Sequence, residues 1–237
     1  MEKLKTGIEG LDTLLYGGIP KGRACLIAGE PGTGKTLFSL QFLLEGLQEG
    51  QRAIYITIDE KPEHLISDAL ALGWDLRPYL ESGTFQILDV TGYFSTSDIG
   101  DNEGINVTQI IKDIVEFVQK NKADRLAIDP IAPLVFTGHG TSQVVAYIRR
   151  LIFMLESEAS CTTLLTSYVP VGSEKISHHG IEEFAASGII LLRLTQMNQK
   201  YIRTIRVRKM RGTRIDLSEY SFEILPQRGL VLRQPVS

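Results

Sequence analysis

Cysteine is scarce in this sequence, with only Cys25 and Cys161 among 237 residues. Each lies in an apolar run that is typical of an interior strand. Neither belongs to a C-x-x-C pair, the pattern found in many redox and zinc sites. We therefore expect both thiols to be buried as small hydrophobic groups in a reducing compartment.

Long hydrophobic runs and an excess of positive charge are also missing. The first ten residues, MEKLKTGIEG, lack the apolar core of a signal peptide, and no run approaches the ~20 residues that a membrane helix needs. We expect no membrane association and a cytoplasmic location. The formal net charge of -3 predicts no general attraction to nucleic acid or anionic lipid, although it leaves room for a local basic face.

The chain is long and apolar enough for one large α/β domain over residues 1–237, since 43% of its residues are hydrophobic. A short apolar helix is expected within residues 1–22, before a Gly-Gly turn. Strands and amphipathic helices alternate from Arg23 onward, which predicts a mainly parallel sheet with helices on both faces. The predicted strands are 23–29, 53–58, 84–90, 126–129 and 162–167, and the predicted helices are 36–47, 62–72, 107–119 and 142–156.

The alternation of strands and helices stops near the end of the sequence. Four further predicted strands, 188–194, 201–208, 222–225 and 230–232, have no helices between them. We expect them to form an antiparallel hairpin layer that completes the domain. Two long polar loops, 91–104 and 169–180, are of a length that indicates a functional or mobile segment.

The stretch GEPGTGKT fills every fixed position of the phosphate-loop pattern G-x-x-x-x-G-K-[ST]. Its glycines allow backbone N–H groups to turn toward phosphate oxygens, and the following helix presents its positive end there. We expect Lys35 to reach the β- and γ-phosphates of a nucleoside triphosphate and Thr36 to ligate Mg²⁺. An accidental glycine turn is disfavoured by the strand before it and the helix after it. The predicted binding residues are Gly29, Glu30, Pro31, Gly32, Thr33, Gly34, Lys35, Thr36 and Leu37.

Acidic residues follow two of the predicted strands. Asp129 ends the apolar run RLAID and has the form of the carboxylate that holds the metal's water shell. We expect its strand to neighbour the strand of the phosphate loop, which would bring Asp129 beside Thr36. Asp59 and Glu60 directly follow the run AIYITI, and one of them would activate the attacking water there. A structural alternative is that Asp59 and Glu60 begin the next helix, because acids are favoured at a helix N-terminus. Strand alternation points only one of the two into the site.

Six segments, taken in order, resemble one KaiC-type domain of the RecA-like ATPases. They are TGIEGLDTLLYGGIPKG, GEPGTGKT, YITIDEKPEHL, LAIDP, GIEEFAASGIILL and VRKMRGT. The resemblance extends over nearly the whole chain, from Thr6 to Pro235. The phosphate loop is shared by many families, whereas its combination with TGIEGLD and the late K-M-R-G-T segment is far more specific.

The resemblance implies Mg-dependent ATP hydrolysis in a ring, usually of six subunits, with nucleotide held between neighbours. It implies that Lys209 and Arg211, of the K-x-R-G-T segment, contact the phosphates of the adjacent subunit's ATP. Such cations would neutralise charge that develops on the γ-phosphoryl group. Strand alternation puts both side chains on one face. The alternative is a solvated basic face of an edge hairpin, comprising Arg203, Arg206, Arg208, Lys209, Arg211 and Arg214.

Three departures from the family pattern narrow this inference. The usual Glu-Glu pair is Asp59-Glu60 here, and an acid one methylene shorter favours slow turnover. The chain has one such domain and lacks the tail used for clock-protein contact, so circadian timing is not implied. Glu183 and Phe184 occupy the positions where the autokinase half of the best-known member carries Ser-Thr, so self-phosphorylation has no acceptor there.

Two rival functions stay open. The first is a DNA-dependent recombination or repair ATPase, whose channel loop would correspond to residues 169–180. That loop carries Lys175 but also Glu174, and it lacks aromatic residues for stacking bases. Its His178-His179 pair has no nearby acid or cysteine that completes a zinc site.

The second rival is an interaction module that uses ATP only to bridge subunits. Two further questions concern the nucleotide itself. At the end of the predicted strand 162–167 lie Thr166, Ser167 and Tyr168, whose hydroxyl groups either sense the γ-phosphate or are structural. No residue pattern in the sequence distinguishes ATP binding from GTP binding.

Overall fold

The structure is a computed structural model that describes residues 1–92, 107–132, 141–169, 176–177, 185–197 and 199–236. Its centre is a nine-stranded sheet in the order β11-β10-β9-β8-β3-β7-β6-β4-β5. The strands are β3 (Ala24–Gly29), β4 (Ala53–Thr57), β5 (Phe85–Asp89), β6 (Arg125–Asp129), β7 (Thr162–Tyr168), β8 (Gly188–Met197), β9 (Lys200–Met210), β10 (Glu219–Leu225) and β11 (Gly229–Pro235). A separate ribbon pairs β1 (Lys3–Leu4) with β2 (Ile19–Pro20).

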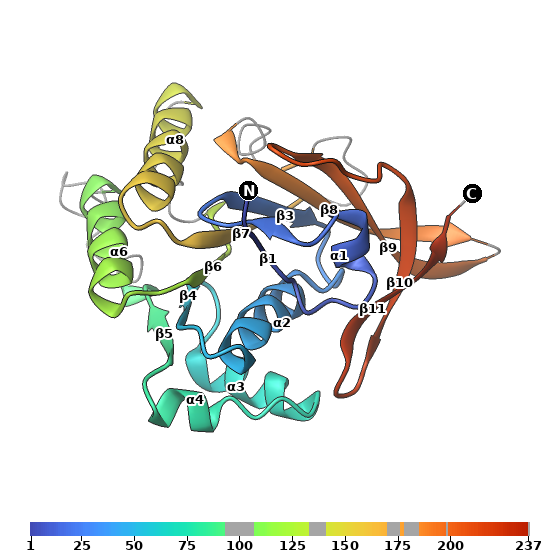
Figure 1. The fold of residues 1–237 in the computed structure, drawn as a ribbon, viewed down its shortest axis with the longest axis horizontal. Coiled ribbons are helices and arrows are strands. Elements are labelled where there is room, and N and C mark those ends of the chain that lie inside the picture. Colours follow the sequence, from blue (N-terminus) through green and yellow to red (C-terminus); the bar gives the residue numbers. More distant parts are fainter. Residues whose placement is uncertain (93–106, 133–140, 170–175, 178–184, 198, 237) are drawn as a thin grey trace, which may run out of the picture.

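The sheet is parallel from β8 to β5 and antiparallel from β8 to β11. This arrangement confirms the predicted α/β fold, with a mainly parallel sheet and an antiparallel layer at the end of the chain. The antiparallel strands curl toward α2 (Lys35–Gln48) on one side of the molecule, where the Leu230 N–H of β11 donates to the Gln41 side chain (Figure 1). The carboxyl ends of the parallel strands meet at one edge, where open α/β sheets place their ligands.

Helices cover both faces of the parallel strands (Figure 1). They are α1 (Leu11–Leu14), α2 (Lys35–Gln48), α3 (Pro62–Ala71), α4 (Arg77–Glu81), α6 (Val107–Asn121) and α8 (Thr141–Ser157). Along β3, Cys25 and Ile27 join the core beneath α1, α2 and α3, whereas Leu26 and Ala28 join the core beneath α6 and α8. Both faces are therefore apolar, which explains why the parallel strands read as continuous hydrophobic runs.

The local elements match the sequence predictions to within a few residues, with two exceptions. The one-turn helix α4 and the β1–β2 ribbon were not predicted, because both are too short to show a periodic pattern. Both thiols are buried and free, as expected from their apolar surroundings. In the part of the chain that the structure describes, no helix is long and apolar enough to cross a membrane.

Candidate nucleotide-binding site

The phosphate loop joins the end of β3 to the start of α2. Gly34 has φ +99° at the position that precedes α2, a conformation that glycine adopts without strain. Gly29 ends β3 so close to β8 that an added Cβ would lie 2.3 Å from the carbonyl oxygen of Leu192. These two glycines therefore meet backbone requirements of the strand–loop–helix geometry, and the loop amides lie at the positive end of α2.

Lys35 is folded back on the loop that precedes it. Its Nζ atom donates to the carbonyl oxygens of Gly29 and Glu30, both at 2.9 Å. Burial lowers the pKa of Lys35, while the negative charges of Asp129 and Glu30 act in the opposite direction. The ammonium is thus partly desolvated beside the loop, where its charge interacts more strongly with an anion than it would in water.

Asp129 is the centre of a cluster of hydroxyl donors. Thr36 Oγ1 donates to Asp129 Oδ2 at 2.7 Å, and Tyr55 donates to the same oxygen at 2.5 Å. Thr166 donates to the other carboxylate oxygen, Oδ1. We expected the strand of Asp129 to neighbour the loop strand, but β7 lies between β6 and β3. The contact with Thr36 still forms, because β3, β7 and β6 end at the same edge of the sheet.

The Thr36 hydroxyl and the Asp129 carboxylate fit a magnesium ion. Both are hard oxygen ligands, and Mg²⁺ is usually bound by one or two such protein groups together with phosphate oxygens and water. Their 2.7 Å contact places both groups beside the phosphate loop. Among the described residues, no group of three or more His, Cys, Asp or Glu side chains is arranged to hold a metal ion.

Asp59 and Glu60 lie in a turn between β4 and α3. The Thr57 hydroxyl donates to the Glu60 carbonyl oxygen at 2.5 Å and accepts from the Glu60 N–H at 3.3 Å, which closes this turn. Since α3 begins at Pro62, neither acid belongs to the helix, and that structural alternative was wrong. Asp59 is exposed and Glu60 is half-buried.

Both of these carboxyl groups have a raised pKa. For Asp59 the main cause is partial desolvation of its carboxyl group, although the residue as a whole is exposed, and the charge of Asp129 is the second cause. For Glu60 the main cause is again burial, followed by the charges of Asp68 and Asp129, while His64 acts in the opposite direction. A raised pKa brings a carboxylate closer to the range in which it accepts a proton efficiently. Both acids follow β4, whose last residue, Thr57, pairs with Asp129 of β6, so all three carboxyl groups belong to the same edge of the sheet.

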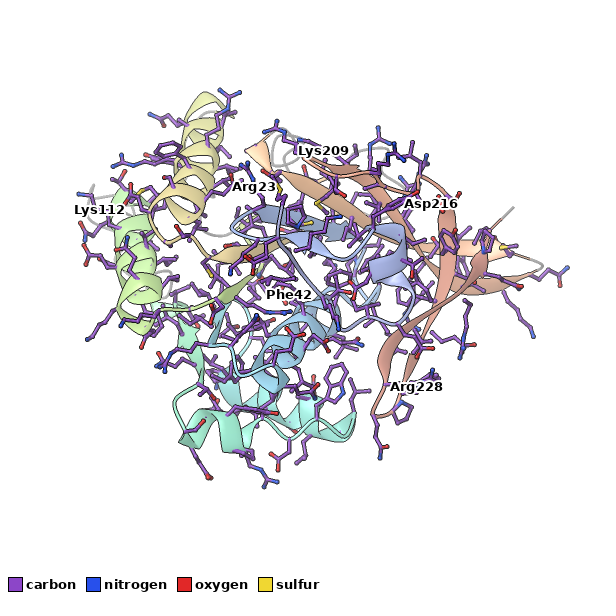
Figure 2. All side chains as sticks on the ribbon, viewed as in Figure 1. Arg23, Phe42, Lys112, Lys209, Asp216 and Arg228 are labelled. Atoms are coloured by element: carbon purple, nitrogen blue, oxygen red, sulfur yellow. The ribbon has the colours of Figure 1, made fainter. Side chains whose placement is uncertain are left out.

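Lys209 and Arg211 lie far from the loop of their own chain. The backbone N–H of Arg211 donates to Ser187 O at 2.9 Å, and Ser187 N–H donates to Ala24 O at 2.8 Å, at the start of β3. The loop begins at the other end of β3, roughly 17 Å away at about 3.3 Å per residue. Figure 2 labels Lys209 and Arg23 near this end. The distance exceeds the reach of an arginine side chain.

The two cations differ in their contacts. Lys209 Nζ donates to Ala186 O at 2.7 Å, whereas the Arg211 side chain is exposed. The strand β9 ends at Met210, so the alternation argument that placed both side chains on one face does not extend to Arg211. Arg211 instead lies in the turn formed by residues 211–213, which we call the arm turn.

Sequence reasoning missed two residues at the loop. Tyr55 reads as an ordinary core aromatic of β4, and only the pairing of β4 with β6 brings its hydroxyl to Asp129. Arg203 was placed in a general basic face, but its Nε atom donates to Gly32 O at 3.2 Å, within its own chain's phosphate loop. The hydroxyl group of Tyr55, in an otherwise apolar run, was the one feature of the sequence that could have indicated its contact with a polar site. For Arg203 the sequence held no such feature.

Several predicted features fall outside the described residues. They are Glu174, Lys175, His178, His179, Glu183 and Phe184, together with most of the loop 91–104.

The hydroxyl group of Thr166 contacts Asp129, so one of the proposed γ-phosphate sensors lies at the candidate site. Ser167 is buried, and Tyr168 is partly exposed.

Comparisons with known proteins cover almost the entire chain. A family described as "ATPase: KaiC" matches residues 4–236. The crystal structure of a KaiC-like protein from Pyrococcus horikoshii OT3 superposes with a TM-score of 0.84 at 33% identity, covering 98% of this chain and 99% of that one. A UPF0273 protein of Thermotoga maritima is 34% identical over 98% of this chain and 96% of its own length.

Proteins of the circadian clock are also similar. The circadian clock protein KaiC3 of Synechocystis sp. is 34% identical over 98% of this chain. The chain spans less than half of the length of that relative, 46%. The remainder of that relative lies outside the match.

Proposed function

Since this chain belongs to the KaiC family of ATPases, we propose that residues 1–237 form one Mg-dependent ATPase domain that works in a homohexameric or similar ring. The observation that carries the proposal is the 2.7 Å contact between Thr36 and Asp129 at the phosphate loop. It brings together the hydroxyl and the carboxylate that such an ATPase uses for its metal. The two buried, free cysteines favour a reducing compartment such as the cytoplasm.

The residues of the loop bind and orient the triphosphate. The backbone N–H groups of the loop, except at Pro31, which has none, would cradle the phosphate oxygens together with the start of α2. Lys35 would leave its carbonyl partners for the β- and γ-phosphates. Thr36 and Asp129 would hold Mg²⁺, which supplies positive charge at the phosphate oxygens when bound. Tyr55 and Thr166 keep the Asp129 carboxylate in place.

Glu60 or Asp59 would accept the proton of the attacking water. The water oxygen forms a bond to the γ-phosphorus, the bond from that phosphorus to the β–γ bridging oxygen breaks, and ADP leaves. The water proton passes to the carboxylate and then to solvent. The raised pKa of both acids supports this role, and the shorter side chain of Asp59 favours slow turnover if Asp59 is the base.

A neighbouring subunit would complete the site. The arm turn lies at the end of the sheet opposite its own phosphate loop, so its cation reaches a nucleotide only on another chain. Arg211, with Lys209 once it leaves Ala186, would neutralise charge on the neighbour's γ-phosphoryl group. This geometry links hydrolysis to assembly.

A phosphate-release assay, run beside a measurement of assembly size, tests the proposal. We expect Mg- and ATP-dependent release by the assembled form that single-stranded DNA does not change. Stimulation by DNA, together with DNA affinity that falls steeply with salt, would indicate a DNA-dependent ATPase instead. Assembly with ATP but without phosphate release would indicate a module that uses ATP only as a bridge between subunits.

A further inference from the structure

The Lys3 ammonium joins the amino-terminal ribbon to the arm turn. Its Nζ atom donates to Leu15 O at 2.7 Å, to Tyr16 O at 2.8 Å and to Thr213 Oγ1 at 2.5 Å. A lysine ammonium has three donors, and these contacts use all of them. Lys3 and Thr213 are 210 residues apart in the sequence, so only the fold brings them together.

The ribbon gives Lys3 a fixed position. Its strands pair Lys3 with Pro20 and Leu4 with Ile19, and both Leu4 and Ile19 are buried in the core. The two carbonyl groups that Lys3 caps follow α1, where a helix leaves carbonyl oxygens without helical partners and favours a positive charge. The ammonium is therefore held on rigid backbone, and Thr213 is its only partner in the arm turn.

Three further contacts hold the arm turn and the residues just after it against the domain. Arg211 N–H donates to Ser187 O at 2.9 Å, and Asp216 N–H donates to Leu14 O at 3.0 Å. The Met1 side chain packs beside Gly212. Figure 2 labels Lys209 and Asp216, which lie before and after this turn. The exposed Arg211 guanidinium is the one long side chain that the turn presents to solvent.

We propose that Lys3 is a positioning residue for ATP hydrolysis at the neighbouring subunit's site, because its bond to Thr213 fixes the arm turn from which Arg211 extends. The inference rests on the proposed role of Arg211 in trans. A cation contributes to catalysis only when it is held close to the developing charge, and a displacement of about 1 Å costs up to roughly 100-fold in rate. Thr213 belongs to the arm turn, which lies at the end of β3 opposite its own chain's phosphate loop.

Two substitutions test the contact, and each removes one side of it. Lys3→Met removes the ammonium, and Thr213→Val removes the hydroxyl while leaving both carbonyl contacts of Lys3 intact. Each is expected to lower ring turnover by about tenfold, with assembly size and ATP affinity unchanged. Thr213→Ser keeps a hydroxyl and is the matched control, with turnover near that of the unmodified protein. The double variant Lys3→Met/Thr213→Val should be no slower than either single variant.

Mixed rings supply a readout that a general loss of stability would not change. Lys3→Met chains have an intact phosphate loop, and Lys35→Ala chains have an intact arm turn. Mixing the two in equal amounts places some intact phosphate loops beside intact arm turns of Lys35→Ala chains. Turnover should therefore rise severalfold above the sum of the two separate proteins. Native mass spectrometry verifies that the rings contain both chains.

The outcomes separate this inference from the proposed function. If Arg211→Ala lowers turnover but Lys3→Met and Thr213→Val do not, the positioning role is overturned and the trans site stands. Additive losses in the double variant, or mixed rings that gain no turnover, also overturn the positioning role. If Arg211→Ala leaves turnover unchanged, the trans site itself fails and the role of Lys3 fails with it.

Discussion

The phenol oxygen of Tyr55 lies 2.5 Å from Asp129 Oδ2, the same carboxylate oxygen that accepts a hydrogen bond from Thr36. Tyr55 is 1% exposed, and burial together with the Asp129 charge raises its pKa well above the usual value. The phenol therefore stays protonated and donates to the carboxylate at physiological pH. Asp129 is held and oriented by hydroxyl groups from α2, β4 and β7.

Tyr55→Phe should weaken this arrangement while leaving the ring in the core. A hydrogen bond to a charged group contributes roughly 1.5–3 kcal/mol, so we expect turnover to fall by about tenfold and to require more Mg²⁺. Phosphate release measured against free Mg²⁺ at saturating ATP gives both quantities. Tyr79→Phe is the control at a partly buried tyrosine far from Asp129. Equal Mg²⁺ dependence in Tyr55→Phe and the unmodified protein would show that the phenol has no positioning role.

Lys35→Ala should abolish ATP turnover, with a loss of at least roughly 100-fold, because it removes the cation nearest to the transferred phosphoryl group. Phosphate release and ATP affinity are measured on the same sample. Lys112→Ala, on the exposed face of α6 (Figure 2), removes one positive charge far from the loop and should have no effect. Turnover that persists in Lys35→Ala would show that the loop is not the site of hydrolysis.

Arg211→Ala should lower turnover by roughly 100-fold or more, while ATP binding to the isolated subunit stays nearly unchanged. The reason is that Arg211 lies too far from its own loop to contact bound nucleotide. Arg208→Ala removes an exposed arginine from the preceding strand, β9, and is the matched control. Equal losses in both variants would indicate a general effect of the basic face, not a specific contact by Arg211.

Glu60→Gln and Asp59→Asn identify the residue that activates water. Replacing the true base should lower turnover by roughly 100-fold or more, whereas replacing its neighbour should have a much smaller effect. A raised pKa means that the active carboxylate is lost as the pH falls, at values above its ordinary pKa of 4.5 for Glu60 or 3.8 for Asp59. The acid limb of the pH–rate profile should disappear in the variant that lacks the base.

The same pKa shifts have a consequence for stability. A carboxyl group whose pKa is raised by folding stabilises the protein below its unfolded pKa, and this contribution is lost as the pH rises through the folded pKa. At neutral pH, Glu60→Gln should therefore unfold at a temperature no lower than the unmodified protein, even while its turnover falls. A clearly lower unfolding temperature would contradict the burial of this carboxylate in its charged form.

Arg125 is the largest fully buried side chain among the residues that the structure describes, and Arg125→Lys should destabilise the fold by about 3 kcal/mol. Its guanidinium donates to Gln51, Lys5, Phe42 and Glu49, and lies 4.5 Å from the centre of the Phe42 ring. A lysine cannot reproduce this planar fork. Urea unfolding measures the loss, and Arg77→Lys, at an exposed ion pair, should leave the midpoint unchanged.

Much of the fold was predictable because it depends on patterns between near neighbours in the sequence. The apolar runs of β3, β4 and β6 are continuous because both faces are covered, and the amphipathic spacing of α6 reflects one covered face. The helix α2 is instead buried around most of its circumference. The phosphate loop was predictable for a related reason, since glycines at fixed positions are needed for the turn itself. The proximity of Thr36 to Asp129 followed from the rule that parallel strands end at one edge.

The order and register of strands decided the remaining contacts. Tyr55 reaches Asp129 because β4 lies beside β6, and Arg203 reaches Gly32 because the antiparallel layer curls toward the loop. No local pattern carries that information, because a hydroxyl in a core strand or a cation on a hairpin has the same sequence signature wherever the strand is placed.

The sequence by itself determined the triphosphate loop, its acidic partners and the α/β class, because these depend on residue type and on spacing over a few positions. Only the tertiary structure decided which distant groups meet, such as Lys3 with Thr213, and that Arg211 lies near the start of β3, at the opposite end from its own loop. The physical reason is that such contacts form when burial of two apolar sheet faces fixes the strand order, and that burial is a property of the whole chain.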